Sequence, residues 1–201
     1  MKWEVSGLTN EEILIVLKRD LTPHRYLHTI AVAETAERLS KRFGVAPERA
    51  YLAGILHDCA KSMTLEDMVR LSDEMGVDAD DFERNSDAIM HAPAGAARAE
   101  KEFGIRDREI LSAVRKHTVG GTGLTQLEKL IYVSDFIEPN RKPFEGLEDA
   151  RKLAETNLDE AAQKCAELSM KYVLECGQKV HPATEKMREE TKCTANPLTS
   201  Q

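Results

Sequence analysis

The residues best suited to chemistry in this sequence are histidines and aspartates that interrupt apolar helical stripes. His28 lies four residues before Val32, and His117 occupies a similar stripe, so both imidazoles fall on faces that should point into the protein. Asp135 follows Ile131 by four residues, which places a carboxylate on a buried face where an unpaired charge is costly. A compensating partner is therefore expected beside Asp135.

Three further residues extend this set. The dipeptide His57-Asp58 ends a strongly apolar stretch, and His91 directly precedes a run of small residues, 93–99. Adjacent helical side chains diverge by about 100°. His57 and Asp58 can therefore bind the same ligand only near the end of the helix, where a metal ion would contact both. Neutral imidazoles and carboxylates suit iron, manganese, zinc and similar ions, and a carboxylate can bridge two ions. The candidate metal ligands, drawn from five segments, are His28, His57, Asp58, His91, His117 and Asp135.

Each of these residues also has a purely structural interpretation. A single buried histidine is more often a hydrogen-bonded core residue than a metal ligand. The His-Asp dipeptide by itself recurs by chance in many chains. The joint placement of all six favours one shared site, while periodicity does not show whether the five segments converge.

The elements that would position these residues are helices, because the alternating β-branched runs typical of strands are absent. Pro23 and Pro47 suit the first turns of two helices, and Thr64, Asp107 and Thr125 suit N-caps of three others. The predicted helices cover residues 23–43, 47–58, 65–75, 93–99, 108–117, 126–138, 147–156 and 158–176. The sequence therefore predicts an all-α fold.

Length and charge restrict the class of protein. The chain has 201 residues, with 28 Lys and Arg against 35 Asp and Glu, for a net charge of −7. We expect one globular domain over 1–190 and a polar, disordered tail over 191–201. The acidic balance argues against duplex nucleic acid as a partner, and the longest apolar run, 50–56, is too short to cross a membrane. Without an N-terminal apolar signal segment or a paired cysteine motif, a cytoplasmic protein with reduced thiols is expected.

The order and spacing of the six candidates resemble the H…HD…H…H…D pattern of the HD-domain metal-dependent phosphohydrolases. More narrowly, the chain resembles the YqeK family, the symmetrical diadenosine tetraphosphate hydrolases of bacteria. The similarity covers roughly residues 10–190 and is strongest in RYLHTIAV (25–32), LHDCAK (56–61), HT (117–118), YVSDFIEPNR (132–141) and HPAT (181–184). It implies a single HD-domain helical bundle over residues 1–190.

The resemblance also implies a metal site with one or two divalent ions, iron first and manganese or a similar ion as alternatives. The ligands of the first ion would be His28, His57, Asp58 and Asp135. In a two-ion form, Asp58 bridges to a second ion held by His91 and His117, whereas in a one-ion form these two histidines face phosphate. The residues with implied catalytic roles are Asp58, Lys61, His91 and His117.

The implied reaction is attack of a metal-activated hydroxide on an inner phosphorus, with ADP as leaving group and product. The implied substrate-binding residues are Arg25, His28, Lys61, His91, His117, Thr118 and Arg141. Each cation has an alternative role: Arg25 is solvated or salt-bridged, Lys61 pairs with Asp58 or caps a helix, and Arg141 faces water. Thr118 alternatively caps its helix.

Other functions remain open at this level. The same ligands would serve an HD phosphohydrolase of a monophosphate, deoxynucleotide or guanosine polyphosphate, or a protein that senses a nucleotide without turnover. The 132–141 string favours the dinucleoside polyphosphate, and no ligand position is lost. The last long helices pack internally or form a homodimer interface, and the pattern assigns no role to His24 or His181.

Overall fold

The computed structural model describes the backbone of residues 8–194 and the side chains of residues 8–190. Within that range the chain forms α-helices, one short 3-10 segment and no strand, which confirms the all-α prediction. The helices are α1 Asn10–Asp20, α2 Pro23–Ser40, η1 Lys41–Phe43, α3 Pro47–Leu56, α4 Leu65–Met75, α5 Asp81–Arg84, α6 Asp87–Lys101, α7 Arg108–Lys116, α8 Gln126–Ile137, α9 Leu147–Ala154, α10 Leu158–Glu175 and α11 Pro182–Thr194. None of these helices is both long and apolar enough to cross a membrane.

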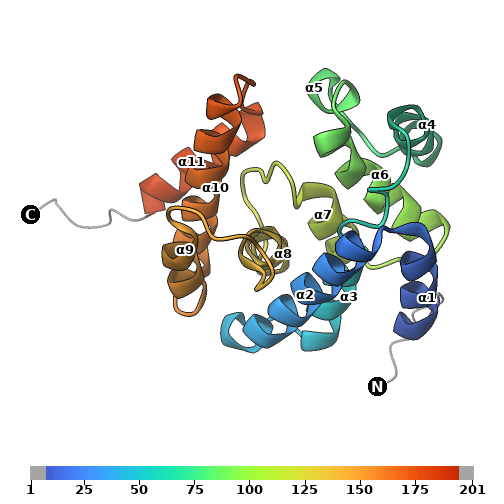
Figure 1. Cartoon of the computed structure of the whole chain (residues 1–201), viewed down its shortest axis with the longest axis horizontal. Helices are drawn as coiled ribbons and strands as arrows, with labels where there is room; N and C mark the ends of the chain where they lie inside the picture. The colour runs from blue at the N-terminus through green and yellow to red at the C-terminus, as the bar shows by residue number, and fades with distance from the viewer. Residues whose placement is uncertain (1–7, 195–201) are drawn as a thin grey trace, which may run out of the picture.

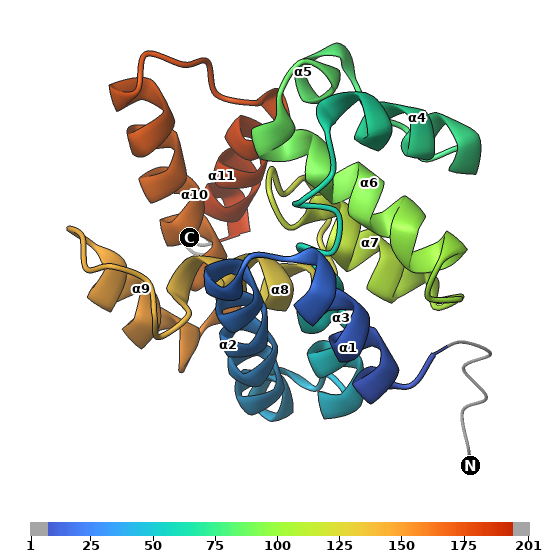
Figure 2. The same cartoon turned by 45° about the vertical axis from the view of Figure 1, so that its right-hand side comes forward.

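Helix α8 lies at the middle of the bundle, as Figure 1 shows. Helices α2, α3, α7 and α10 pack against it, while α6 packs on α7 and carries α4 on its other side. In Figure 2, α10 and α11 stand on one side of the molecule and α4 to α7 on the other, with α8 between them and α2 and α3 below. The candidate ligands thus come from the central helices and from α6.

Several helix ends follow from local capping chemistry. Thr64 accepts a hydrogen bond from the Asp67 N–H and begins α4, and the left-handed Gly76 (φ 65°) ends it. Thr125 and Glu128 form a reciprocal capping box at the start of α8. Because these signals lie within four residues of the helix ends, the sequence predicts the bounds of α4 and α8 closely.

Other elements differ from the sequence-based expectation. His91 lies inside α6, which begins at Asp87, and not before a helix that starts at Pro93. Pro93 occupies the helix interior, where it removes one backbone hydrogen bond, and the helix continues because its small residues pack closely on α4 and α7. Helices α1, α5 and α11 are additional. Helix α11 runs to Thr194, and the rest of the expected tail, 195–201, lies outside the described residues.

Helices α2 and α3 approach each other closely at Gly54. A Cβ on Gly54 would lie 2.5 Å from the Cα of Ala33, which is backbone and does not move aside. We therefore expect Gly54→Ala to lower the free energy of unfolding by about 1–3 kcal/mol or more in urea denaturation. The matched control is Gly95→Ala in α6, where the nearest atom is a Val114 side-chain methyl at 3.2 Å. Equal losses in the two variants would contradict this account.

Candidate metal centre

The six candidate ligands converge at the centre of the bundle. His28 comes from α2 and Asp135 from α8, while His57 and Asp58 follow the last residue of α3. His91 lies in α6 and His117 caps the C-terminal end of α7. The four imidazoles contact one another in series, with ring centroids 5.3 Å apart for His28 and His57 and 5.0 Å apart for His57 and His117 and for His91 and His117.

The cluster is buried, with one partly open side. His57 is 0% exposed and Asp58 2%, whereas the side chain of Asp135 retains 25% exposure. Beside it, the side chains of Arg25 and Arg141 are each 35% exposed. Access from solvent is therefore on the side of Asp135 and these two guanidinium groups.

The Asp58 carboxylate faces two different pairs of histidines. Its Oδ2 lies 3.4 Å from His57 Nε2 and 3.8 Å from His28 Nε2. Its Oδ1 lies 3.1 Å from His91 Nε2 and 3.8 Å from His117 Nε2. This is the placement of a carboxylate that can bridge two cations.

Three of the imidazoles have a hydrogen-bond acceptor beside Nδ1, the ring nitrogen that faces away from the cluster. His57 Nδ1 lies 2.7 Å from the Gly54 carbonyl oxygen, and His117 Nδ1 lies 2.7 Å from the Val114 carbonyl oxygen. His28 Nδ1 lies 3.3 Å from a carboxylate oxygen of Glu138. Since these partners only accept, Nδ1 is the hydrogen-bond donor in each ring, and Nε2 faces the centre of the cluster.

The inward Nε2 atoms lie so close together that each pair requires a proton or a metal ion. Those of His28 and His57 are 3.3 Å apart, with carboxylates beside them. Those of His91 and His117 are 3.1 Å apart, and because His91 accepts from Lys61 Nζ at Nδ1, its own proton is on Nε2. Lone pairs at such distances repel unless a proton or a metal ion lies between them.

The ionisation of the cluster agrees with that requirement. Burial acts to raise the pKa of Asp58 and Asp135, yet the surrounding histidines outweigh it and hold both pKa values below the usual range. Burial also opposes the charge of His57, but the two carboxylates prevail and raise its pKa. Burial lowers the pKa of His91 to about 4, against the pull of Asp58. Asp58 and Asp135 are thus carboxylates and His91 is a neutral imidazole at neutral pH, as metal binding needs, whereas the raised pKa of His57 favours a proton that a bound ion would displace.

The donor atoms form three groups of metal-binding size, each within 4.8 Å: His28, His57, Asp58; His57, His117, Asp135; and Asp58, His91, His117. Imidazole and carboxylate donors together suit iron, manganese and zinc rather than calcium or a soft thiolate-bound metal. The residues present therefore fit a divalent transition metal.

The three predicted cations contact the cluster itself. Arg25 Nη1 lies 2.7 Å from Asp58 Oδ2, so Arg25 forms a salt bridge in this structure, which is one of its alternative roles. Lys61 Nζ lies 2.9 Å from His91 Nδ1 and does not pair with Asp58. Arg141 Nη2 contacts the Asp135 carbonyl oxygen at 2.6 Å and its carboxylate at 3.2 Å.

The remaining predicted residues divide between the site and the surface. Thr118 has a buried hydroxyl without a hydrogen-bond partner among the described atoms, so it does not cap its helix. His24 is exposed. His181 pairs with Asp80 at 3.0 Å, away from the six ligands. Glu138 is part of the site by its contact with His28, although the residue pattern alone did not single it out.

Comparisons with known proteins agree on one family. Residues 25–160 match the model of the HD domain. The symmetrical bis(5'-nucleosyl)-tetraphosphatase of Bacillus subtilis is 41% identical over 88% of this chain and 94% of its own length, and that of Halalkalibacterium halodurans is 39% identical over 85% and 90%. The crystal structure of a Clostridium acetobutylicum protein, described as a predicted HD superfamily hydrolase involved in NAD metabolism, superimposes with a TM-score of 0.89 and 31% identity, covering 94% of this chain and 99% of that one.

This chain therefore belongs to the HD-domain family and, within it, to the family of the symmetrical bis(5'-nucleosyl)-tetraphosphatases, whose members match it over 85% and 88% of its length.

Proposed function

We propose that this chain is a metal-dependent hydrolase that cleaves diadenosine tetraphosphate symmetrically into two molecules of ADP. The observation that carries the proposal is the Asp58 carboxylate, whose two oxygens face two separate histidine pairs. The relatives named for this activity are matched over most of their own length, which supports the same substrate class.

The metal site would hold two divalent ions, with Asp58 between them. His28, His57 and Asp135 are the other ligands on one side, and His91 and His117 are those on the other side. Bound divalent ions supply Lewis acidity, which polarises a phosphoryl oxygen and activates water as a nucleophile. We propose iron as the ion in the cell, with manganese as the substitute, since both accept imidazole and carboxylate donors.

The polyphosphate chain would be held by the cations at the open side. Arg25 and Arg141 now pair with Asp58 and Asp135, the carboxylates that bound ions would neutralise. Their guanidinium groups then become available for phosphate oxygens, which they bind in a forked geometry. Lys61, beside His91, adds a third positive charge.

Two donors without partners point to further substrate contacts. The Thr118 hydroxyl and the Arg141 Nε are buried and have no acceptor among the described atoms. A buried donor without an acceptor costs about 1–3 kcal/mol, and a phosphate oxygen would satisfy it. ADP is a good leaving group when a phosphoric anhydride bond is cleaved, so no separate general acid is required. The role of these contacts is therefore to stabilise negative charge on the phosphate oxygens.

Separation of the reaction products tests the proposal. Protein purified without oxygen and supplied with iron or manganese should convert diadenosine tetraphosphate to ADP alone. Equal amounts of ATP and AMP would contradict symmetrical cleavage. An intact dinucleotide, with turnover of a monophosphate or a guanosine polyphosphate, would favour the alternative HD phosphohydrolase.

We also propose that the protein acts in the cytoplasm with reduced thiols. Cys59 and Cys165 are buried free thiols, and burial raises the pKa of Cys59 to about 12, so it is protonated and unreactive.

A further inference from the structure

Glu138 is a buried carboxylate whose surroundings point to a role at His28. It is the first residue after α8 and is 3% exposed. Its Oε1 lies 3.3 Å from His28 Nδ1, and its Oε2 accepts a hydrogen bond from the Asn140 N–H at 2.6 Å. Among the described side chains, neither Lys nor Arg pairs with this carboxylate. A buried charge with so little compensation is expensive, and His28 is the one side chain of the described residues that pairs with it.

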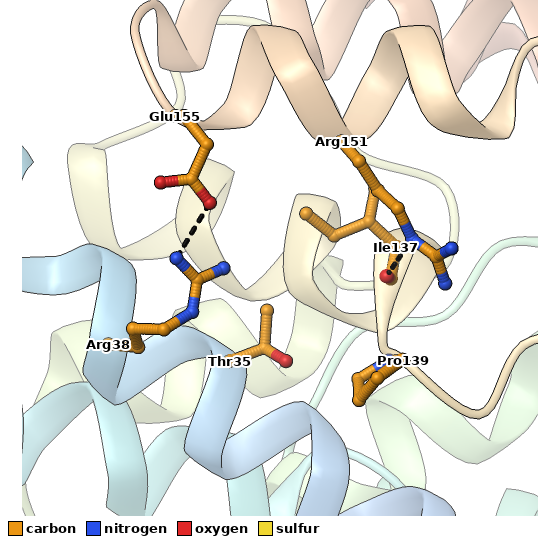
Figure 3. A pocket seen from close by; sticks show the side chains of 6 residues that line it. All are labelled: Thr35, Arg38, Ile137, Pro139, Arg151 and Glu155. Atoms are coloured by element: carbon orange, nitrogen blue, oxygen red, sulfur yellow. Dashed lines mark hydrogen bonds and ion pairs between the residues drawn. The ribbon is translucent and has the colours of Figure 1, made fainter.

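The position of Glu138 is fixed by its backbone. Arg151 of α9 donates its Nε to the Ile137 carbonyl oxygen at 3.0 Å and its Nη2 to the Glu138 carbonyl oxygen at 2.8 Å. Figure 3 shows Arg151 reaching the Ile137 carbonyl at the edge of a cavity of about 360 Å³, with Pro139 close by. Proline limits the backbone before and at its own position, so the chain leaves α8 in one direction. The carboxylate is therefore placed before any ligand binds.

His28 differs from two of its neighbours in how its outer nitrogen is held. His57 and His117 each use a backbone carbonyl three residues earlier in the same helix or turn. His28 uses a side chain 110 residues away, directly after the end of α8. Its ring orientation thus depends on the packing of α8 against α2 through Glu138.

We propose that Glu138 is a positioning residue for His28. By accepting a hydrogen bond from the Nδ1–H, it keeps Nε2 directed at the space beside Asp135 Oδ1, 3.0 Å away, and Asp58 Oδ2. A carboxylate in this position also increases the donor strength of the imidazole. The inference rests on His28 being a metal ligand, as in the proposed function, and it concerns metal affinity rather than the choice of substrate.

Glu138→Gln is the most direct test. The native carboxylate accepts from two N–H groups, whereas an amide has one accepting oxygen, so His28 or Asn140 loses its acceptor. We expect the affinity for Mn²⁺ or Zn²⁺, measured by chelator competition, to fall about 10–100-fold. The matched control is Glu128→Gln, a buried glutamate in the first turn of α8 that bonds Lys116 and Ser112 and lies outside the site. Its metal affinity should be unchanged.

Two results would overturn the proposal. One is wild-type metal affinity in Glu138→Gln, and the other is an equal loss in both variants, which would reflect general destabilisation. A readout independent of folding is the ¹H–¹⁵N spectrum of the zinc-loaded wild type, where the His28 proton should be on Nδ1; a proton on Nε2 contradicts the proposal. Because these assays contain no nucleotide, a protein that binds metal but leaves diadenosine tetraphosphate intact would refute the proposed function alone.

Discussion

Asp58→Asn is expected to lower the rate of diadenosine tetraphosphate hydrolysis by about three orders of magnitude or more and to remove bound metal. The substitution keeps the shape of the side chain and removes its charge. Asp58 now presents one oxygen to each of two histidine pairs, whereas an asparagine would present an N–H group to one of them. Metal analysis and product chromatography on the same preparation would measure both effects.

The control for Asp58→Asn is a buried carboxylate outside the cluster. Glu128 is 3% exposed and pairs with Lys116 at 2.8 Å, so Glu128→Gln removes a buried charge of the same kind. It should lower the free energy of unfolding while leaving metal content and hydrolysis at the wild-type level. Retention of metal and activity in Asp58→Asn would show that the carboxylate is not the common ligand.

The helices could be predicted closely wherever their ends carry local signals. Thr64 and Gly76 bound α4, and Thr125 with Glu128 begins α8, because each cap acts within a few residues. Helix α6 was placed wrongly since its N-cap, Ser86, makes no side-chain hydrogen bond and its Pro93 resembles a first-turn proline. There, tertiary packing of small residues prevails over the local signal.

The candidate site shows a similar division. Periodicity indicates that His28, His117 and Asp135 point inward, and family resemblance groups them with the others. Periodicity does not reveal that the two oxygens of Asp58 face different histidine pairs, an arrangement that the resemblance implies for a two-ion form and that depends on how α3 ends against α6 and α7. Glu138 could not be assigned a role because its partner His28 is 110 residues away. Contacts between distant segments are set by packing, to which a single sequence gives no direct access.

Substitution of His91 should distinguish a two-ion from a one-ion centre. His91 Nε2 contacts Asp58 Oδ1 at 3.1 Å and stands on the side of the cluster away from His28. In the two-ion form, His91→Gln removes one of three ligands of the second ion. We expect the bound metal to fall from two ions to one per chain and the rate of hydrolysis to fall by about a hundredfold or more.

The same substitution at His24, which is exposed on α2, is the control and should change neither quantity. If the wild type binds one ion and His91→Gln retains it, the two-ion centre is wrong. His91, with Lys61 at 2.9 Å from its Nδ1, would then be part of the phosphate-binding surface. In that case the substitution should mainly raise the KM for diadenosine tetraphosphate, because a phosphate contact binds the substrate and the transition state equally.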